Sequence, residues 1–166
     1  MAQDKAQHQP RGPLAGVRVV DMTAVVLGPL ATQILGDYGA DVIKIEPLEG
    51  DLMRANGAQK ADGSTAGLSS IFLAINRNKR SLAIDLKTDE GRDAVRKLVR
   101  GADVFVHNMR PGSAAKLGVD AESLCARFPR LVHVLPRHRE LPRQLQHAAG
   151  HRRFLVHRPT LHRFRH

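Results

Sequence analysis

The chain has 166 residues, of which 42 % are apolar, and a formal net charge of +10. This length fits a single domain with enough apolar residues to bury a core. The single cysteine, Cys125, excludes an internal disulfide and favours a reducing, cytoplasmic setting. The polar segment 1–13 lacks a signal-peptide pattern, and no apolar run approaches the ~20 residues needed to span a bilayer, so we expect a soluble protein.

The composition changes abruptly near residue 135. Residues 1–134 hold 18 basic and 15 acidic residues, whereas residues 135–166 hold eight Arg, six His, no Lys and only one acid, Glu140. The sequence therefore predicts three parts: a disordered leader over 1–12, one folded part over 13–134, and a disordered basic tail over 135–166. We hypothesise that this tail is the product of a frameshift and is not the evolved continuation of the fold.

Short β-branched runs alternate with segments of helical character. Strands are expected at residues 17–20, 41–45, 81–84, 103–106 and 131–134. Val- and Ile-rich runs separated by helices are typical of βαβ units. The predicted fold class is therefore α/β, with a mostly parallel sheet and flanking helices.

The helices between the strands are marked by their end residues. A first helix is expected from Pro29, with Leu30, Ile34 and Tyr38 on one apolar face and a stop at Gly39. Thr88 is expected to cap a helix that ends near residue 100, with acids in its first turn and bases in its last. A short helix over 121–127 and an irregular surface loop over 47–67 complete the expected elements.

Ligands of open α/β sheets bind at the carboxyl ends of the strands. Glu46 ends the second strand where a ribose-binding acid would sit, but the turn after the first strand lacks G-x-G-x-x-G, so a dinucleotide site is not expected. The alternative is that Asp21 and Glu46 are polar residues that simply end buried strands. The basic segment 76–80 by itself favours a solvated loop over a ligand site. Segment 108–112 either places a cation beside the ligand edge or simply starts a helix, with Pro111 at its first position.

Several linked segments together resemble a known family. They are residues 13–21, 28–29, 35–46, 76–87 and 108–118, in matching order and spacing. Over residues 13–134 the chain resembles the family III CoA-transferases of the carnitine and bile-acid-inducible type, which include formyl-CoA transferases and α-methylacyl-CoA racemases.

The resemblance implies a Rossmann-like domain, present here in incomplete form, that binds coenzyme A along the strand ends. It also implies interlocked homodimers, and acyl-CoA and a carboxylic acid as substrates. Carried over by position, the CoA-contacting residues would be Val26, Leu27, Ile84, Asp85, Leu86, Lys87, Asn108, Met109, Arg110 and Lys116. Lys116 stands where the family usually has Arg, which keeps the charge but loses the planar fork of donors.

Catalysis in this family, by the same resemblance, uses residues beyond the fifth strand. Transferases use an aspartate nucleophile, and the racemase branch uses a His/Asp pair. No Asp follows Asp120, so no catalytic residue is assigned, and a fragment without turnover is expected. The open alternatives are a racemase-like fragment, a non-catalytic CoA-binding module, and a nucleic-acid-binding protein acting through the tail. The tail histidines match no zinc spacing, so no metal is expected.

Overall fold

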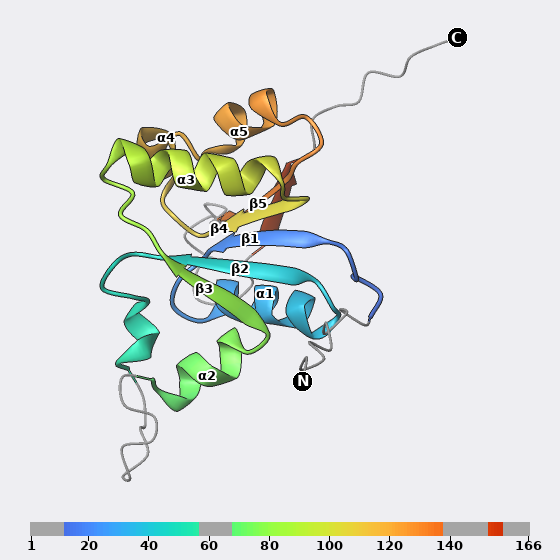
Figure 1. Cartoon of the computed structure of the whole chain (residues 1–166), viewed down its shortest axis with the longest axis vertical. Coiled ribbons are helices and arrows are strands. Elements are labelled where there is room, and N and C mark those ends of the chain that lie inside the picture. Colours follow the sequence, from blue (N-terminus) through green and yellow to red (C-terminus); the bar gives the residue numbers. More distant parts are fainter. Residues whose placement is uncertain (1–11, 57–67, 138–152, 158–166) are drawn as a thin grey trace, which may run out of the picture.

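A computed structural model describes residues 12–56, 68–137 and 153–157 of the chain (Figure 1). Its described strands form one sheet in the order β3-β2-β1-β4-β5-β6. The first five pair in parallel, and β6 pairs antiparallel to β5. The strands are β1 (Arg18–Met22), β2 (Asp41–Glu46), β3 (Lys79–Ala83), β4 (Val104–His107), β5 (Val132–Arg137) and β6 (Arg153–His157).

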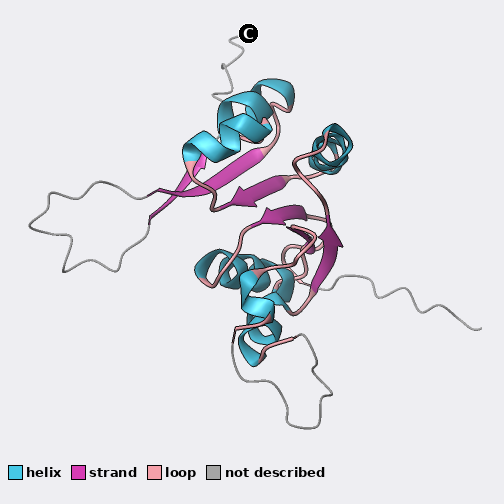
Figure 2. Ribbon diagram, turned by 90° about the vertical axis from the view of Figure 1, so that its left-hand side faces the viewer, coloured by secondary structure: helices cyan, strands magenta, loops and turns pink. Residues whose placement is uncertain are grey.

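Helices cover both faces of this sheet. They are α1 (Leu27–Asp37), the 3-10 turn η1 (Leu52–Arg54), α2 (Ser70–Asn76), α3 (Asp89–Arg100), α4 (Pro111–Leu117) and α5 (Ala121–Arg127). Figure 2 shows them in two groups, with α3, α4 and α5 on one face and α1 and α2 on the other. This arrangement confirms the predicted α/β class with a parallel sheet and flanking helices. No helix of the described part is long and apolar enough to cross a bilayer.

Two apolar clusters hold the layers together. The larger cluster lies between the sheet and the α3–α5 face, where Phe105 of β4 packs with Val95 and Val99 of α3 and with Leu124 of α5. The smaller cluster lies on the α1 face and contains Val19, Val42 and Val106. The central strands are therefore buried on both sides, which explains their nearly continuous apolar sequences.

The predicted strands and caps agree closely with the structure. Each expected strand is present with ends shifted by at most a few residues; the third begins at Lys79 and ends at Ala83. The Thr88 hydroxyl accepts a hydrogen bond from the Gly91 amide at 3.0 Å, and Asp120 caps α5 through the Ser123 amide. These residues form helix starts because their side chains satisfy backbone N–H groups that have no partner within the helix.

Helix α1 differs from its prediction in the face that it buries. Leu30, Ile34 and Tyr38 are 38 %, 44 % and 54 % exposed, whereas the polar Thr32 and Gln33 are buried. These three residues share one face of α1, as their spacing predicts, but that face is the outer side of the helix. The inner side is polar because Thr32 donates a hydrogen bond to the buried Asp21 carboxylate at 2.6 Å.

Two segments differ from the sequence-based expectations. The sequence pattern predicts no helix at residues 70–76, but α2 forms there, with the Ser69 hydroxyl accepting from the Phe72 amide at 3.1 Å. The loop expected at 47–67 contains η1, and its residues 57–67 lie outside the described part.

The predicted disordered tail was placed at residues 135–166. In the structure, β5 continues to Arg137, and residues 153–157 pair with it as β6. The apolar run Phe154-Leu155-Val156 favours a strand, and the outer edge of β5 offers unpaired backbone groups to it. The leader and the remaining tail residues lie outside the described part, so their predicted disorder stays a prediction.

A buried ion pair joins both sheet and helices at the end of β1. The Asp21 carboxylate is fully buried and lies 3.0 Å from the ammonium of Lys79, which is itself 1 % exposed. The same ammonium donates to the Pro29 carbonyl at 2.7 Å and to the Asn76 amide oxygen at 2.9 Å. Burial lowers the pKa of Lys79, and the adjacent Asp21 charge opposes that effect. One side chain of β3 thus fixes β1, α1 and α2 together.

The Lys79→Met substitution tests this pair. It leaves the Asp21 carboxylate buried without its counter-charge, so we expect the free energy of unfolding to fall by about 3–5 kcal/mol. Arg80→Met in the same strand is the matched control, because Arg80 is 64 % exposed in its pair with Asp41; a loss below about 1 kcal/mol is expected there. Urea titrations followed by circular dichroism measure both, and equal losses would contradict the assignment.

Candidate functional site

A cavity of about 390 Å³ opens at the carboxyl ends of the parallel strands. Its walls come from the segments that follow four different strands, so the sheet topology creates it. The lining residues are Met22, Thr23, Ala24, Lys44, Ile45, Glu46, Pro47, Leu48, Glu49, Asp51, Ile84, Asp85, Leu86, Lys87, Asn108, Met109 and Leu117. Most of the accessible surface of this lining is apolar, with polar groups placed among the apolar ones, as is usual for small-molecule sites.

The β1–α1 loop forms one wall in a strained conformation. Val25 has φ 73°, which β-branched residues rarely adopt. The Asn108 side chain accepts from the Ala24 amide at 3.0 Å and donates to the Ala24 carbonyl at 2.8 Å. The Val25 amide donates to Asp51 at 3.3 Å. The surrounding structure therefore fixes this loop in place.

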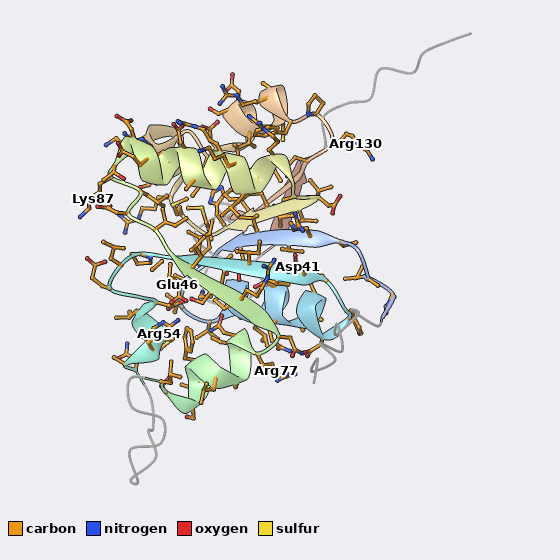
Figure 3. The ribbon with its side chains drawn as sticks, in the orientation of Figure 1. Asp41, Glu46, Arg54, Arg77, Lys87 and Arg130 are labelled. Carbon is orange, nitrogen blue, oxygen red and sulfur yellow. The ribbon has the colours of Figure 1, made fainter. Side chains whose placement is uncertain are left out.

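Two acid–base pairs build the wall that follows β2. Lys44 and Asp51 are each 1 % exposed and lie 2.9 Å apart. Glu46 accepts two hydrogen bonds from the Arg54 guanidinium, each of 2.7 Å, and one from the Ser81 hydroxyl at 2.6 Å. Burial would raise the pKa of Glu46, but these bonds outweigh it and lower that pKa to about 2. Figure 3 shows Glu46 and Arg54 beside β3.

The turn from β3 into α3 forms the third wall. The Lys87 amide donates to the Asp85 carboxylate at 2.9 Å, and Arg92 donates to the carbonyls of Leu86 and Lys87 at 3.0 and 2.8 Å. The Lys87 ammonium is not engaged by these bonds, and Figure 3 shows Lys87 at the left-hand edge of the molecule. Lys87, Arg110 and Lys116 form no ion pair with any carboxylate in the described part of the chain.

Gly91 allows this turn to lie directly against α3. A Cβ atom at Gly91 would lie 1.9 Å from the Asp85 carbonyl oxygen, so Gly91→Ala must displace the turn. We expect a loss of about 1–3 kcal/mol in the free energy of unfolding, as for other overpacked sites. Thermal unfolding would measure it.

Gly112→Ala serves as the control for Gly91→Ala, because nothing lies within 4 Å of a Cβ atom at Gly112 in α4. Alanine favours helix over glycine, so we expect an unchanged or higher melting temperature for this variant. Equal melting temperatures of the two variants would show that the close contact at Gly91 does not affect stability.

A buried histidine supports the fourth wall. His107 ends β4 and is 2 % exposed, and its Nδ1 atom accepts from the Met109 amide at 3.2 Å. Its Nε2 atom is buried and has no hydrogen-bond partner in the described residues. The ring lies 5.0 Å from the ring of His133. Burial, with the neighbouring His133, lowers the pKa of His107 to about 4.

This shift predicts acid sensitivity of the folded state. The pKa of His107 is about 4 in the folded state and 6.5 in the unfolded state. The free energy of unfolding is therefore highest above pH 6.5 and falls as the pH drops toward 4, because the unfolded state binds a proton there that the folded state does not. The expected loss is about 3 kcal/mol across that window. Urea titrations at several pH values measure it. The His107→Gln variant should lose less stability over the same window, and an unchanged pH dependence would contradict the prediction.

The structure brings together six of the ten residues that the resemblance assigned to CoA. They are Ile84, Asp85, Leu86, Lys87, Asn108 and Met109, all of which line the cavity. Val26 and Leu27 begin α1, and Arg110 and Lys116 belong to α4 and its cap; these four are not part of the lining. Segment 76–80 lies elsewhere: Arg77 and Arg80 pair with Asp37 and Asp41 near the amino ends of the strands.

Sequence reasoning missed the residues that build the β2 wall. Lys44, Asp51 and Arg54 form no recognisable sequence motif. The segment 47–67, which contains two of them, was expected to be an irregular loop. One signal was present: Lys44 interrupts the apolar run 42–45 of a strand buried on both faces, and a buried lysine needs a carboxylate partner.

The sequence profile of CoA-transferase family III matches residues 14–136. The chain belongs to CoA-transferase family III. Family relatives include succinate–glutarate CoA-transferase of Agrobacterium fabrum, which is 46 % identical over 125 residues, or 73 % of this chain and 31 % of that protein. Succinyl-CoA:mesaconate CoA-transferase of Haloarcula hispanica is 43 % identical over 122 residues, or 74 % of this chain and 31 % of that protein.

Solved structures of the family have the same fold. A CAIB/BAIF family protein from Brucella suis superimposes with a TM-score of 0.67 at 42 % identity, covering 74 % of this chain and 32 % of that one. The Rv3272 protein of Mycobacterium tuberculosis gives a TM-score of 0.68 at 39 % identity, covering 75 % and 34 %. This family III chain therefore spans about a third of the length of the relatives that it matches.

Proposed function

We propose that this family III chain binds the coenzyme A moiety of an acyl-CoA in the cavity at the carboxyl ends of its strands. The observation that carries the proposal is the position of Lys87, a cation that has no ion-pair partner among the described residues and lies on the rim of a mostly apolar cavity. Apolar walls suit the adenine and pantetheine parts of CoA, and a free ammonium suits its phosphates. Arg110, which follows Met109 directly, and Lys116 would add positive charge at the same edge.

The reaction in which we propose that this site takes part is transfer of CoA between an acyl-CoA and a carboxylic acid. The names of the relatives support it, since they pair succinate or succinyl-CoA with a second carboxylic acid. The homodimer and the cytoplasmic setting implied above stay predictions.

We further propose that this chain binds CoA without turnover. Glu46 and Asp51 line the cavity, but Arg54 and Lys44 hold their carboxylates. Asp85 accepts from the Lys87 amide of its own turn. Three of the acids at the cavity are thus engaged in structure, which disfavours their use as a nucleophile. CoA exchange between succinyl-CoA and glutarate by the purified chain would contradict this part of the proposal.

Titration calorimetry with CoA and with 3′,5′-ADP tests the binding site. Lys87→Gln removes the unpaired charge, so we expect CoA affinity to fall by about tenfold and the 3′,5′-ADP affinity to fall with it. Lys97→Gln is the matched control, because Lys97 is an exposed lysine in the last turn of α3. The affinity of the Lys97→Gln variant for CoA and for 3′,5′-ADP should be unchanged.

Rising salt should weaken CoA binding by the wild type more than by Lys87→Gln, since salt screens the exposed charge. Absence of CoA binding by the wild type would refute the proposal. Equal affinity of wild type and Lys87→Gln would refute the role of Lys87.

A further inference from the structure

Four consecutive polar groups of the β1–α1 loop are held by side chains from other parts of the fold. The Thr23 carbonyl accepts from Lys44 at 2.8 Å, and the Val25 amide donates to Asp51. Between them, both backbone groups of Ala24 bond to Asn108. All four of these hydrogen bonds come from β2 and its loop or from the end of β4, so the loop conformation depends on tertiary contacts.

The loop needs this restraint because of Val25. A β-branched residue with φ 73° is strained, and such a conformation persists only where its surroundings enforce it. Without restraint, Val25 would return to extended backbone and carry Ala24 with it. Thr23 and Ala24 line the cavity, whereas Val25 does not, so the strain at Val25 acts on the cavity through its neighbours.

The Asn108 amide uses both of its ends on the loop. Its oxygen accepts a hydrogen bond from the Ala24 amide, and its nitrogen donates one to the Ala24 carbonyl. The side chain thus makes a pair of hydrogen bonds with the backbone of one residue. Sequence position alone assigned Asn108 to the ligand. The geometry instead directs its hydrogen-bonding groups toward the wall of the site.

We infer that Asn108 is a positioning residue, which holds the strained β1–α1 loop so that the cavity wall is formed before CoA binds. The inference rests on the proposed CoA function. It differs from a direct ligand contact because Asn108 acts through the conformation of Val25. Preformed walls strengthen binding, because ordering the loop then does not reduce the free energy of ligand binding.

A double-mutant cycle separates the two roles. Asn108→Ala should weaken CoA affinity by about tenfold when residue 25 is valine, but by less than about threefold in a Val25→Gly background, because glycine adopts positive φ without restraint. If Asn108 contacts CoA directly, the loss will be the same in both backgrounds, which would overturn the inference. Should Asn108→Ala not fold, Asn108→Asp tests the same cycle, since it loses only the donor to Ala24.

A ligand-independent measurement keeps the inference testable if CoA does not bind. The ¹³C chemical shifts and the amide-to-Hα coupling of Val25 report its φ angle in the free protein. In Asn108→Ala they should move to extended values, and retention of the left-handed values would overturn the inference. Failure of the wild type to bind CoA would refute the proposed function alone, and these signals would still decide the role of Asn108.

Asn78→Ala is the matched control. Asn78 also has a positive φ, 61°, and its amide donates to Asp37 at 2.8 Å, near the amino ends of the strands. This variant should lower the melting temperature without changing CoA affinity or the Val25 signals. A loss of affinity equal to that of Asn108→Ala would show that general destabilisation explains both, and would overturn the inference.

Discussion

Burial of two lysines beside their aspartates is the constraint on which the carboxyl edge of this sheet depends. Lys79 and Lys44 are each 1 % exposed, and each would be very costly to bury without a carboxylate. Their partners are Asp21, near the carboxyl end of β1, and Asp51, in the loop that follows β2. The need to satisfy these charges therefore fixes how the loops leave the sheet, and the loops form the cavity. The same interactions that stabilise the fold shape the site.

The cost of this arrangement is concentrated in the β1–α1 loop. Left-handed backbone at Val25 is unfavourable, and the bonds from Asn108 and Asp51 offset it. Stability and cavity shape are coupled at this point, because the residues that compensate the strain also line the cavity. Polar contacts also shape α1, which turns Thr32 and Gln33 inward and leaves Leu30, Ile34 and Tyr38 partly exposed. The helix orientation follows the buried carboxylate more than the apolar pattern.

Membership of CoA-transferase family III fits a chain with a mostly apolar cavity at the carboxyl ends of its strands, where Glu46, Asp51 and Asp85 are already engaged by other groups. Glu46 is held by Arg54, and its lowered pKa keeps it charged and hydrogen-bonded over the physiological range. Such a carboxylate is a structural group and a poor nucleophile, since attack would require breaking two strong hydrogen bonds. The chain spans about a third of the length of its relatives.

The sequence alone determined the five parallel strands, the helices capped by Thr88 and Asp120, and the edge of the sheet at which the cavity opens. These features are local: β-branched runs, side chains that cap N–H groups and helix-stop residues act over a few positions. Position within the family motifs also identified six of the cavity residues. Tertiary structure decided which residues of those segments line the cavity. Lys44, Asp51 and Arg54 could not be placed from sequence because a buried charge is satisfied by a partner that the fold selects. The contacts of Asn108 were decided in the same way, since only the packed loops bring its amide to Ala24.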